Sequence, residues 1–109
     1  MERLELILFT RSGCCLCEGL EKKLQAIPLE DLNIKVQLSI KDIDGNSVTE
    51  KIKQKFSMEV PVLAIKIKDE SLMIKLPRVS PRLKEKDLLN WLNKTICEKM
   101  EGYKPLKEL

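Results

Sequence analysis

Apolar residues fall into short runs along the chain, and their spacing changes from one run to the next. The first run, residues 4–10, is mostly apolar and is broken by Ser12-Gly13, which is typical of a strand buried on both faces. From Cys15 onward, apolar residues recur every three or four positions as far as Pro28, which predicts an amphipathic helix. The chain therefore opens with a strand that leads directly into a helix.

The next segment repeats this order. Apolar and polar residues alternate over 34–40, which predicts a second strand, and the six residues that follow have the composition of a turn. Ser47 and Glu50 have the spacing of a capping box. We therefore expect a short second helix that starts after Ser47 and continues through Lys55.

Two further apolar runs follow Pro61. Residues 62–65 are all apolar, which predicts a third strand. Pro61 lies at its start, where the missing N–H group of proline costs little. The alternation of residues 72–76 predicts a fourth strand, antiparallel to the third and joined to it by a charged turn at 68–70. Up to this point the expected order is strand, helix, strand, helix, strand, strand.

The last periodic segment predicts the longest helix. Ser80 is a favourable N-cap and Pro81 is favourable at the first helical position, so we expect the helix to begin there. Apolar residues then recur at helical spacing as far as Met100, and Gly102 has the position of a C-cap. Residues 103–109 are expected to form a frayed tail.

The composition fits one domain that spans residues 1–109. Of the 109 residues, 43% are apolar, which is enough for a single core. Charges are interspersed with a net value of +3, and only 4% of the residues are aromatic, so we expect no nucleic-acid partner. The N-terminal apolar run is too short for a signal peptide or a membrane span. We therefore expect a cytoplasmic protein that does not bind membranes and is a monomer.

The reactive chemistry is concentrated in the cysteines. Cys14 and Cys17 form a Cys-x-x-Cys motif where the first strand meets the first helix, and we expect Cys14 to be the more exposed. Two thiols at this spacing can close a small disulfide ring, and the unpaired N–H groups of a first helical turn stabilise a thiolate. A redox site, half of a metal site and a buried apolar cluster all stay open from these residues alone. The absence of histidine excludes imidazole bases and His metal ligands.

The order of elements resembles the thioredoxin superfamily, and the segment 9–17 around the cysteines resembles a glutaredoxin active-site segment. More narrowly, the short length, the Arg78-Val79 loop and the ending 88–92 are similar to the small bacterial glutaredoxin-like domain proteins. The resemblance implies an α/β thioredoxin-like fold, with the order β-α-β-α-β-β-α and a four-stranded mixed sheet flanked by helices. It covers nearly the whole chain.

The resemblance also implies roles for individual residues. Cys14 would be the nucleophile and Cys17 the resolving thiol. Arg11 would lie beside the thiolate or a glutathione carboxylate. The Val60-Pro61 bond would be cis and face the disulfide, although only about 5–6% of X-Pro bonds are cis in folded proteins. The backbone of Val60 would then pair with an extended thiol substrate, so Arg11, Val60 and Pro61 are the expected substrate-binding residues.

The function implied is that of a thiol–disulfide oxidoreductase that reduces protein or glutathione mixed disulfides. We expect no bound cofactor and no metal, with glutathione as a candidate co-substrate. Residues 75–80 stand where glutathione-dependent relatives carry Gly-Gly-x-Asp, and Arg78 or the helix start at Ser80 is the candidate replacement for that anion site. Cys15 is expected to be an inert neighbour and Cys97 a packing residue. A non-catalytic binding module and an iron–sulfur or metal carrier are the alternatives.

Overall fold

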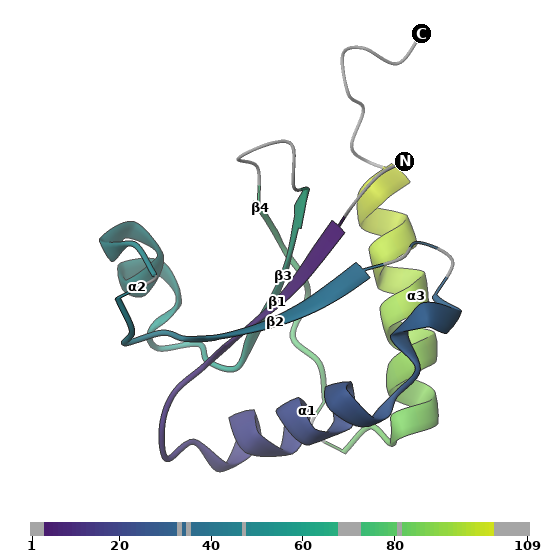
Figure 1. Cartoon of the computed structure of the whole chain (residues 1–109), viewed down its shortest axis with the longest axis horizontal. Helices are drawn as coiled ribbons and strands as arrows, with labels where there is room; N and C mark the ends of the chain where they lie inside the picture. Colours follow the sequence, from purple (N-terminus) through teal and green to yellow (C-terminus); the bar gives the residue numbers. More distant parts are fainter. Residues whose placement is uncertain are drawn as a thin grey trace, which may run out of the picture.

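A computed structural model describes residues 4–32, 34, 36–46, 48–67, 73–80 and 82–101. Figure 1 shows the elements in chain order: β1 (Leu4–Thr10), α1 (Cys15–Ala26), a 3-10 turn (Leu29–Asp31), β2 (Val36–Asp42), α2 (Glu50–Phe56), β3 (Val62–Ile67), β4 (Met73–Lys75) and α3 (Glu85–Glu101). Apart from the 3-10 turn, which was not predicted, this is the order expected from the apolar pattern and the resemblance.

The strands form one mixed sheet of four, in the order β2-β1-β3-β4. Strand β1 pairs in parallel with β2 and antiparallel with β3, and β4 pairs antiparallel with β3. Leu8 of β1 lies opposite Ile40 on one side and Leu63 on the other. The central position of β1, with both faces covered, explains why its sequence is a nearly continuous apolar run.

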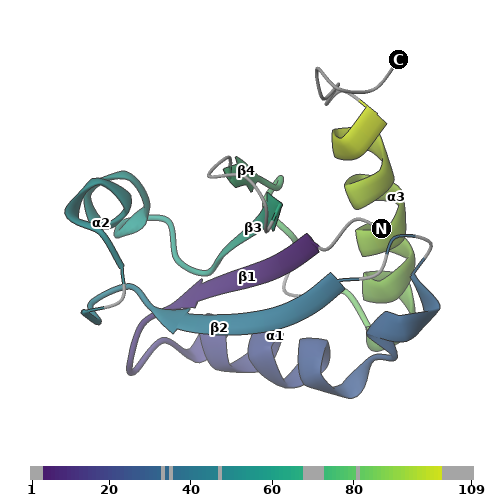
Figure 2. The same ribbon diagram turned by 45° about the horizontal axis from the view of Figure 1, so that its top comes forward.

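Alternate side chains of β1 enter two separate apolar clusters. Leu6 and Leu8 belong to the cluster that includes Leu24 of α1 and Leu92 of α3. On the other face, Phe9 packs in a second cluster with Phe56 of α2, with their ring centroids 5.6 Å apart. Figures 1 and 2 show α1 and α3 on one side of the sheet and the short α2 on the other. The sheet therefore has helices on both faces.

Helix α2 begins later than predicted. Its N-cap is Thr49, whose hydroxyl oxygen accepts a hydrogen bond from the N–H of Ile52 at 3.3 Å. Val48 is buried in the cluster beneath α2, so the chain inserts this side chain into the core before the helix starts. The predicted start after Ser47 is wrong, and Ser47 itself lies outside the described residues.

Helix α3 also begins later, at Glu85, so the predicted start after Ser80 is wrong. The Ser80 hydroxyl oxygen accepts a hydrogen bond from the N–H of Arg82 at 3.3 Å, and its carbonyl accepts one from the N–H of Leu83 at 3.2 Å. Ser80 thus caps an isolated turn that precedes the helix. The ammonium group of Lys23 donates to the carbonyl of Leu83 at 2.7 Å and ties this turn to α1.

Smaller differences concern the ends of the strands, and some predictions fall outside the described residues. Strand β2 begins at Val36, two positions after the predicted start, and β4 ends at Lys75, with Leu76 buried just beyond it. The predicted turn at 68–70, the C-cap Gly102 and the tail 103–109 lie outside the described residues. Within the described part of the chain, none of the helices has the length and apolar character needed to cross a membrane.

Candidate active site

The cysteine motif lies on a tight turn between β1 and α1. Gly13 has a φ of +83°, a left-handed conformation that favours glycine because a side chain would clash with the backbone. The N–H of Cys14 donates to the carbonyl of Arg11 at 3.1 Å, which closes the turn. This geometry places Cys14 at the N-cap of α1, in agreement with the predicted strand-to-helix junction.

Cys14 and Cys17 form a disulfide, with their Cα atoms 5.2 Å apart. The sulfur of Cys14 also accepts a hydrogen bond from the backbone N–H of Cys17 at 3.1 Å. Cys17 is only 1% exposed, whereas Cys14 is half-buried. The predicted order of exposure is confirmed, and an incoming disulfide has access to Cys14 rather than to Cys17.

The position of Cys14 matters for its chemistry because the thiolate is the reactive form of cysteine. When the disulfide is reduced, the first-turn N–H groups of α1 and the positive end of the helix dipole stabilise negative charge on the Cys14 sulfur. Thiol–disulfide exchange needs no separate general base. The absence of histidine is therefore compatible with this reaction.

The other two cysteines are free. Cys15 is exposed next to the disulfide, and Cys97 is half-buried on α3. In the described ranges, no group of three or more cysteine, histidine or acidic side chains is arranged to hold a metal ion.

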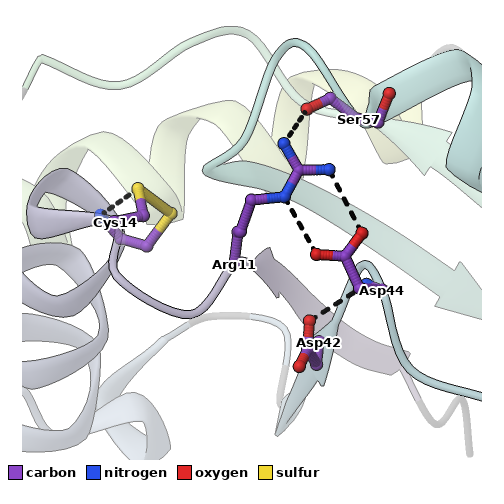
Figure 3. Close-up of polar contacts among 6 residues, drawn as sticks. Arg11, Cys14, Asp42, Asp44 and Ser57 are labelled. Atoms are coloured by element: carbon purple, nitrogen blue, oxygen red, sulfur yellow. Dashed lines mark hydrogen bonds and ion pairs between the residues drawn. A yellow bond between two sulfur atoms is a disulfide. The ribbon is translucent and has the colours of Figure 1, made fainter.

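Arg11 points away from the disulfide, as Figure 3 shows, toward the loop after β2 and the end of α2. Its guanidinium group donates to both carboxylate oxygens of Asp44, at 3.0 and 3.2 Å, and to the carbonyl of Ser57 at 3.1 Å. The hydrogen bond from Arg11 is the main cause that lowers the pKa of Asp44 below its usual value of 3.8. The same bond raises the pKa of Arg11.

Sequence reasoning missed Asp44 and Ser57 as partners of Arg11. A signal for Asp44 was present, because β1 and β2 are parallel and residues just after their carboxyl ends meet at the same edge of the sheet. The register confirms this: Thr10 pairs with Asp42, and the N–H of Ile43 donates to the carbonyl of Thr10 at 2.8 Å. The role of Arg11 in substrate binding stays a prediction.

The Val60-Pro61 peptide bond is cis, as the resemblance implied. Pro61 lines a groove of about 110 Å³ that is also lined by Cys15 and Leu16 at the start of α1. The fold thus brings Pro61 to the cysteine motif, although the two are far apart in sequence. Val60 is half-buried against the apolar cluster beneath α2. A contact of Pro61 with Cys14 itself stays a prediction, as does substrate binding by Val60.

The groove continues into a second cavity of about 360 Å³, which lies within the range of about 300–1,000 Å³ typical of ligand pockets. Both hollows share Leu20, Pro61, Arg78 and Val79. The Arg78-Val79 loop, which carried part of the resemblance, therefore lies between them.

The family-model comparison identifies the glutaredoxin-like domain (DUF836) over residues 5–93. The chain belongs to the glutaredoxin-like domain family. The match includes the cysteine motif, Val60-Pro61 and about the first half of α3, so the resemblance stated from the sequence is confirmed.

Solved structures support the thioredoxin-like fold of this glutaredoxin-like protein. The first thioredoxin domain of mouse protein disulfide-isomerase A4 has a TM-score of 0.59 and 16% sequence identity, covering 97% of this chain and 70% of that one. A structure described as a malarial protein has a TM-score of 0.55 and 19% identity, covering 86% and 98% of the two chains. No curated protein matches the sequence. At these identities the neighbours show the fold alone.

Proposed function

We propose that this glutaredoxin-like protein is a thiol–disulfide oxidoreductase that uses Cys14 and Cys17 to reduce disulfides. The observation that carries the proposal is the asymmetric pair at the start of α1. Cys14 is the more accessible of the two, and its sulfur accepts a hydrogen bond from the N–H of Cys17. Cys17 is buried and forms the disulfide with Cys14. This asymmetry supports Cys14 as the attacking thiol and Cys17 as the resolving thiol.

The reaction consists of two exchange steps. The Cys14 thiolate attacks one sulfur of the substrate disulfide, forms a mixed disulfide and releases the other substrate sulfur as a thiolate. The Cys17 thiolate then attacks the Cys14 sulfur, forms the Cys14–Cys17 disulfide and releases the second substrate thiolate. The protein loses two electrons and the substrate gains them, while solvent supplies the protons that the released thiolates take up.

The substrate we propose is a protein disulfide or a glutathione mixed disulfide, with glutathione as a candidate reductant and no bound prosthetic group. In this proposal the backbone of Val60 and the ring of Pro61 position an extended substrate beside the motif. We also propose that the protein acts as a monomer in the cytoplasm, where thiols are kept reduced.

The mechanism is tested by trapping. Cys17→Ser should accumulate a covalent adduct with a protein disulfide substrate, because the mixed disulfide on Cys14 loses its internal resolving thiol. The matched control is Cys14→Ser, which should give neither adduct nor turnover. A non-reducing gel reports the adducts. If Cys17→Ser turns over at the parental rate without adducts, the dithiol mechanism is wrong.

Two measurements address the alternatives. Metal and iron content of anaerobically purified protein tests the carrier hypothesis. A reductase assay with the same protein disulfide tests the non-catalytic module, which should bind the substrate without reducing it.

A further inference from the structure

The surfaces on the two sides of the disulfide carry opposite charge. The groove and the adjoining cavity on the Cys15 side are lined by four cationic side chains and one carboxylate: Lys23, Lys75, Arg78, Lys99 and Glu59. The hollow on the Cys17 side is lined by three carboxylates and one cation: Glu18, Glu21, Asp42 and Arg11. Arg11 is already bound to Asp44, so its charge is offset. A ligand at the disulfide therefore meets positive charge on one side only.

Of these four cations, Arg78 is the one that lines both the groove and the cavity. Lys75 forms an ion pair with Glu59, and Lys23 donates to the carbonyl of Leu83. Arg78 is exposed and lines both the groove and the cavity, and none of the described residues forms a hydrogen bond or ion pair with its guanidinium group. Its five donors are available for a carboxylate, which a guanidinium group binds in bidentate fashion.

An exposed apolar side chain also lies on the groove. Among the described large hydrophobic residues, those that are exposed are Leu16, at 51%, and Met58, at 91%. Leu16 sits between the two cysteines and forms part of the groove wall. Met58 follows Ser57, whose carbonyl binds Arg11, and precedes the segment that enters the cis proline. Of these two, Leu16 offers an apolar contact on the groove wall.

We propose that the groove beside the disulfide binds an acidic polypeptide segment that flanks the cysteine of the substrate, with Arg78 as the specificity-determining residue. In this arrangement an apolar substrate side chain packs against Leu16 and Val79, and a neighbouring carboxylate binds Arg78. The proposal rests on the proposed reductase function, because it defines the substrate class at the same site. The charge of the groove and a guanidinium group without a partner among the described residues favour an acidic partner over a basic one.

The test uses three disulfide-linked fluorogenic peptides that differ only at two positions next to the cysteine. These positions hold glutamate, glutamine or lysine. With the reduced protein at low salt, we expect kcat/KM for the acidic peptide to exceed that for the basic peptide on the order of tenfold, and the ratio to shrink at 0.5 M salt. Equal values for the three peptides would overturn the proposal.

In Arg78→Glu, kcat/KM for the basic peptide should exceed kcat/KM for the acidic peptide. A merely structural role of Arg78 would not produce this reversal. Arg82→Glu is the matched control because Arg82 is an exposed arginine that lines neither the groove nor the cavity. Arg82→Glu should change kcat/KM for the acidic and the basic peptide by less than about twofold, as expected for a surface charge outside the site. An equal shift in the two variants would mean that net charge, not the groove, selects the peptide, and the proposal would be wrong.

Fluorescence anisotropy with Cys-to-Ser versions of the same peptides separates this proposal from the proposed function. Charge-selective binding that Arg78→Glu reverses, without any turnover, would contradict the reductase function and support the groove assignment. Turnover without charge-selective binding would support the reductase function and contradict the groove assignment. If neither turnover nor charge-selective binding is found, both proposals are wrong. If glutathione disulfide is reduced in preference to the acidic peptide, and Arg78→Glu removes that preference, the groove serves a small anion and the polypeptide assignment is wrong.

Discussion

Arg11 and Arg78, which line hollows on the two sides of the disulfide, differ in their interactions. Arg11 is fixed by both carboxylate oxygens of Asp44 and by the carbonyl of Ser57, so it joins the turn before α1 to the loop after β2 and the end of α2. Arg78 lies on the Cys15 side without such partners among the described residues. The difference indicates that the Cys17 side maintains the geometry of the motif, while the Cys15 side is available for recognition.

The two sides also differ in what supports them. The floor of the groove on the Cys15 side includes Leu88, which is 0% exposed and belongs to the large apolar cluster beneath α1 and α3. The Cys17 side depends on an ion pair whose two side chains are 36% and 58% exposed. Buried apolar contacts contribute far more to stability than exposed ion pairs. The groove should therefore keep its shape when the ion pair is removed.

The largest expected effect comes from the groove floor. Leu88→Ala should lower the free energy of unfolding by about 2–5 kcal/mol, because it leaves a cavity among buried side chains. Leu16→Ala is the matched control: Leu16 lies on the same groove but is 51% exposed, so the change should stay within about 0.5 kcal/mol. Urea unfolding followed by the fluorescence of Trp91, the single tryptophan, measures both. If Leu88→Ala and Leu16→Ala lower the free energy of unfolding equally, Leu88 does not form a rigid floor of the groove.

A smaller effect is expected from the ion pair. Asp44→Asn should destabilise the protein slightly at neutral pH, because Arg11 loses its charged partner. The pKa of Asp44 is lowered in the folded state from 3.8. The stabilisation is therefore present above that value and is lost as the pH falls through the lower pKa of the folded state.

Urea unfolding at a series of pH values between about 6 and 2.5 tests the direction of this pH dependence, because a carboxylate changes its charge only around its own pKa. The difference between parent and Asp44→Asn should shrink at the acidic end. Asp31→Asn provides the control, because Asp31 is an exposed aspartate in the 3-10 turn and forms no ion pair with a described residue. A difference that grows with acid would contradict the assignment.

The smallest effect concerns Cys15. Although it is adjacent to Cys14, the disulfide joins Cys14 to Cys17. The oxidised parent should therefore contain two free thiols, on Cys15 and Cys97, and Cys15→Ser should contain one. Thiol counting under denaturing conditions measures this. A count of three in oxidised Cys15→Ser would mean that no Cys14–Cys17 disulfide had formed without Cys15, and would contradict this pairing.

Much of the fold was predictable because its signals are local. The apolar run of β1, the helical spacing of α1 and the order of elements are all confirmed. The starts of α2 and α3 were not. For α2, Thr49 is a second acceptable N-cap two residues after Ser47. Burial of Val48 excludes the first candidate for α2, and the bond from Lys23 to Leu83 holds the turn that separates Ser80 from α3.

The site was predictable in part for the same reason. The cysteine motif and Val60-Pro61 were recognised from the sequence. The partners of Arg11 come from segments 33 and 46 residues away, and no local pattern indicates Ser57. The opposite charges on the two sides of the disulfide likewise arise from residues that only the fold brings together.

The proposed mechanism assigns the attack to Cys14 and the resolving step to Cys17. The most direct measurement is alkylation of the fully reduced protein near pH 6 with less than one equivalent of iodoacetamide. Trypsin cleaves after Arg11 and Lys22, so Cys14, Cys15 and Cys17 fall in one peptide and fragment-ion mass spectrometry must locate the label. We predict that Cys14 is labelled first, because it is the N-cap of α1 and more exposed than Cys17. Faster labelling of Cys15 or Cys17 would contradict the account.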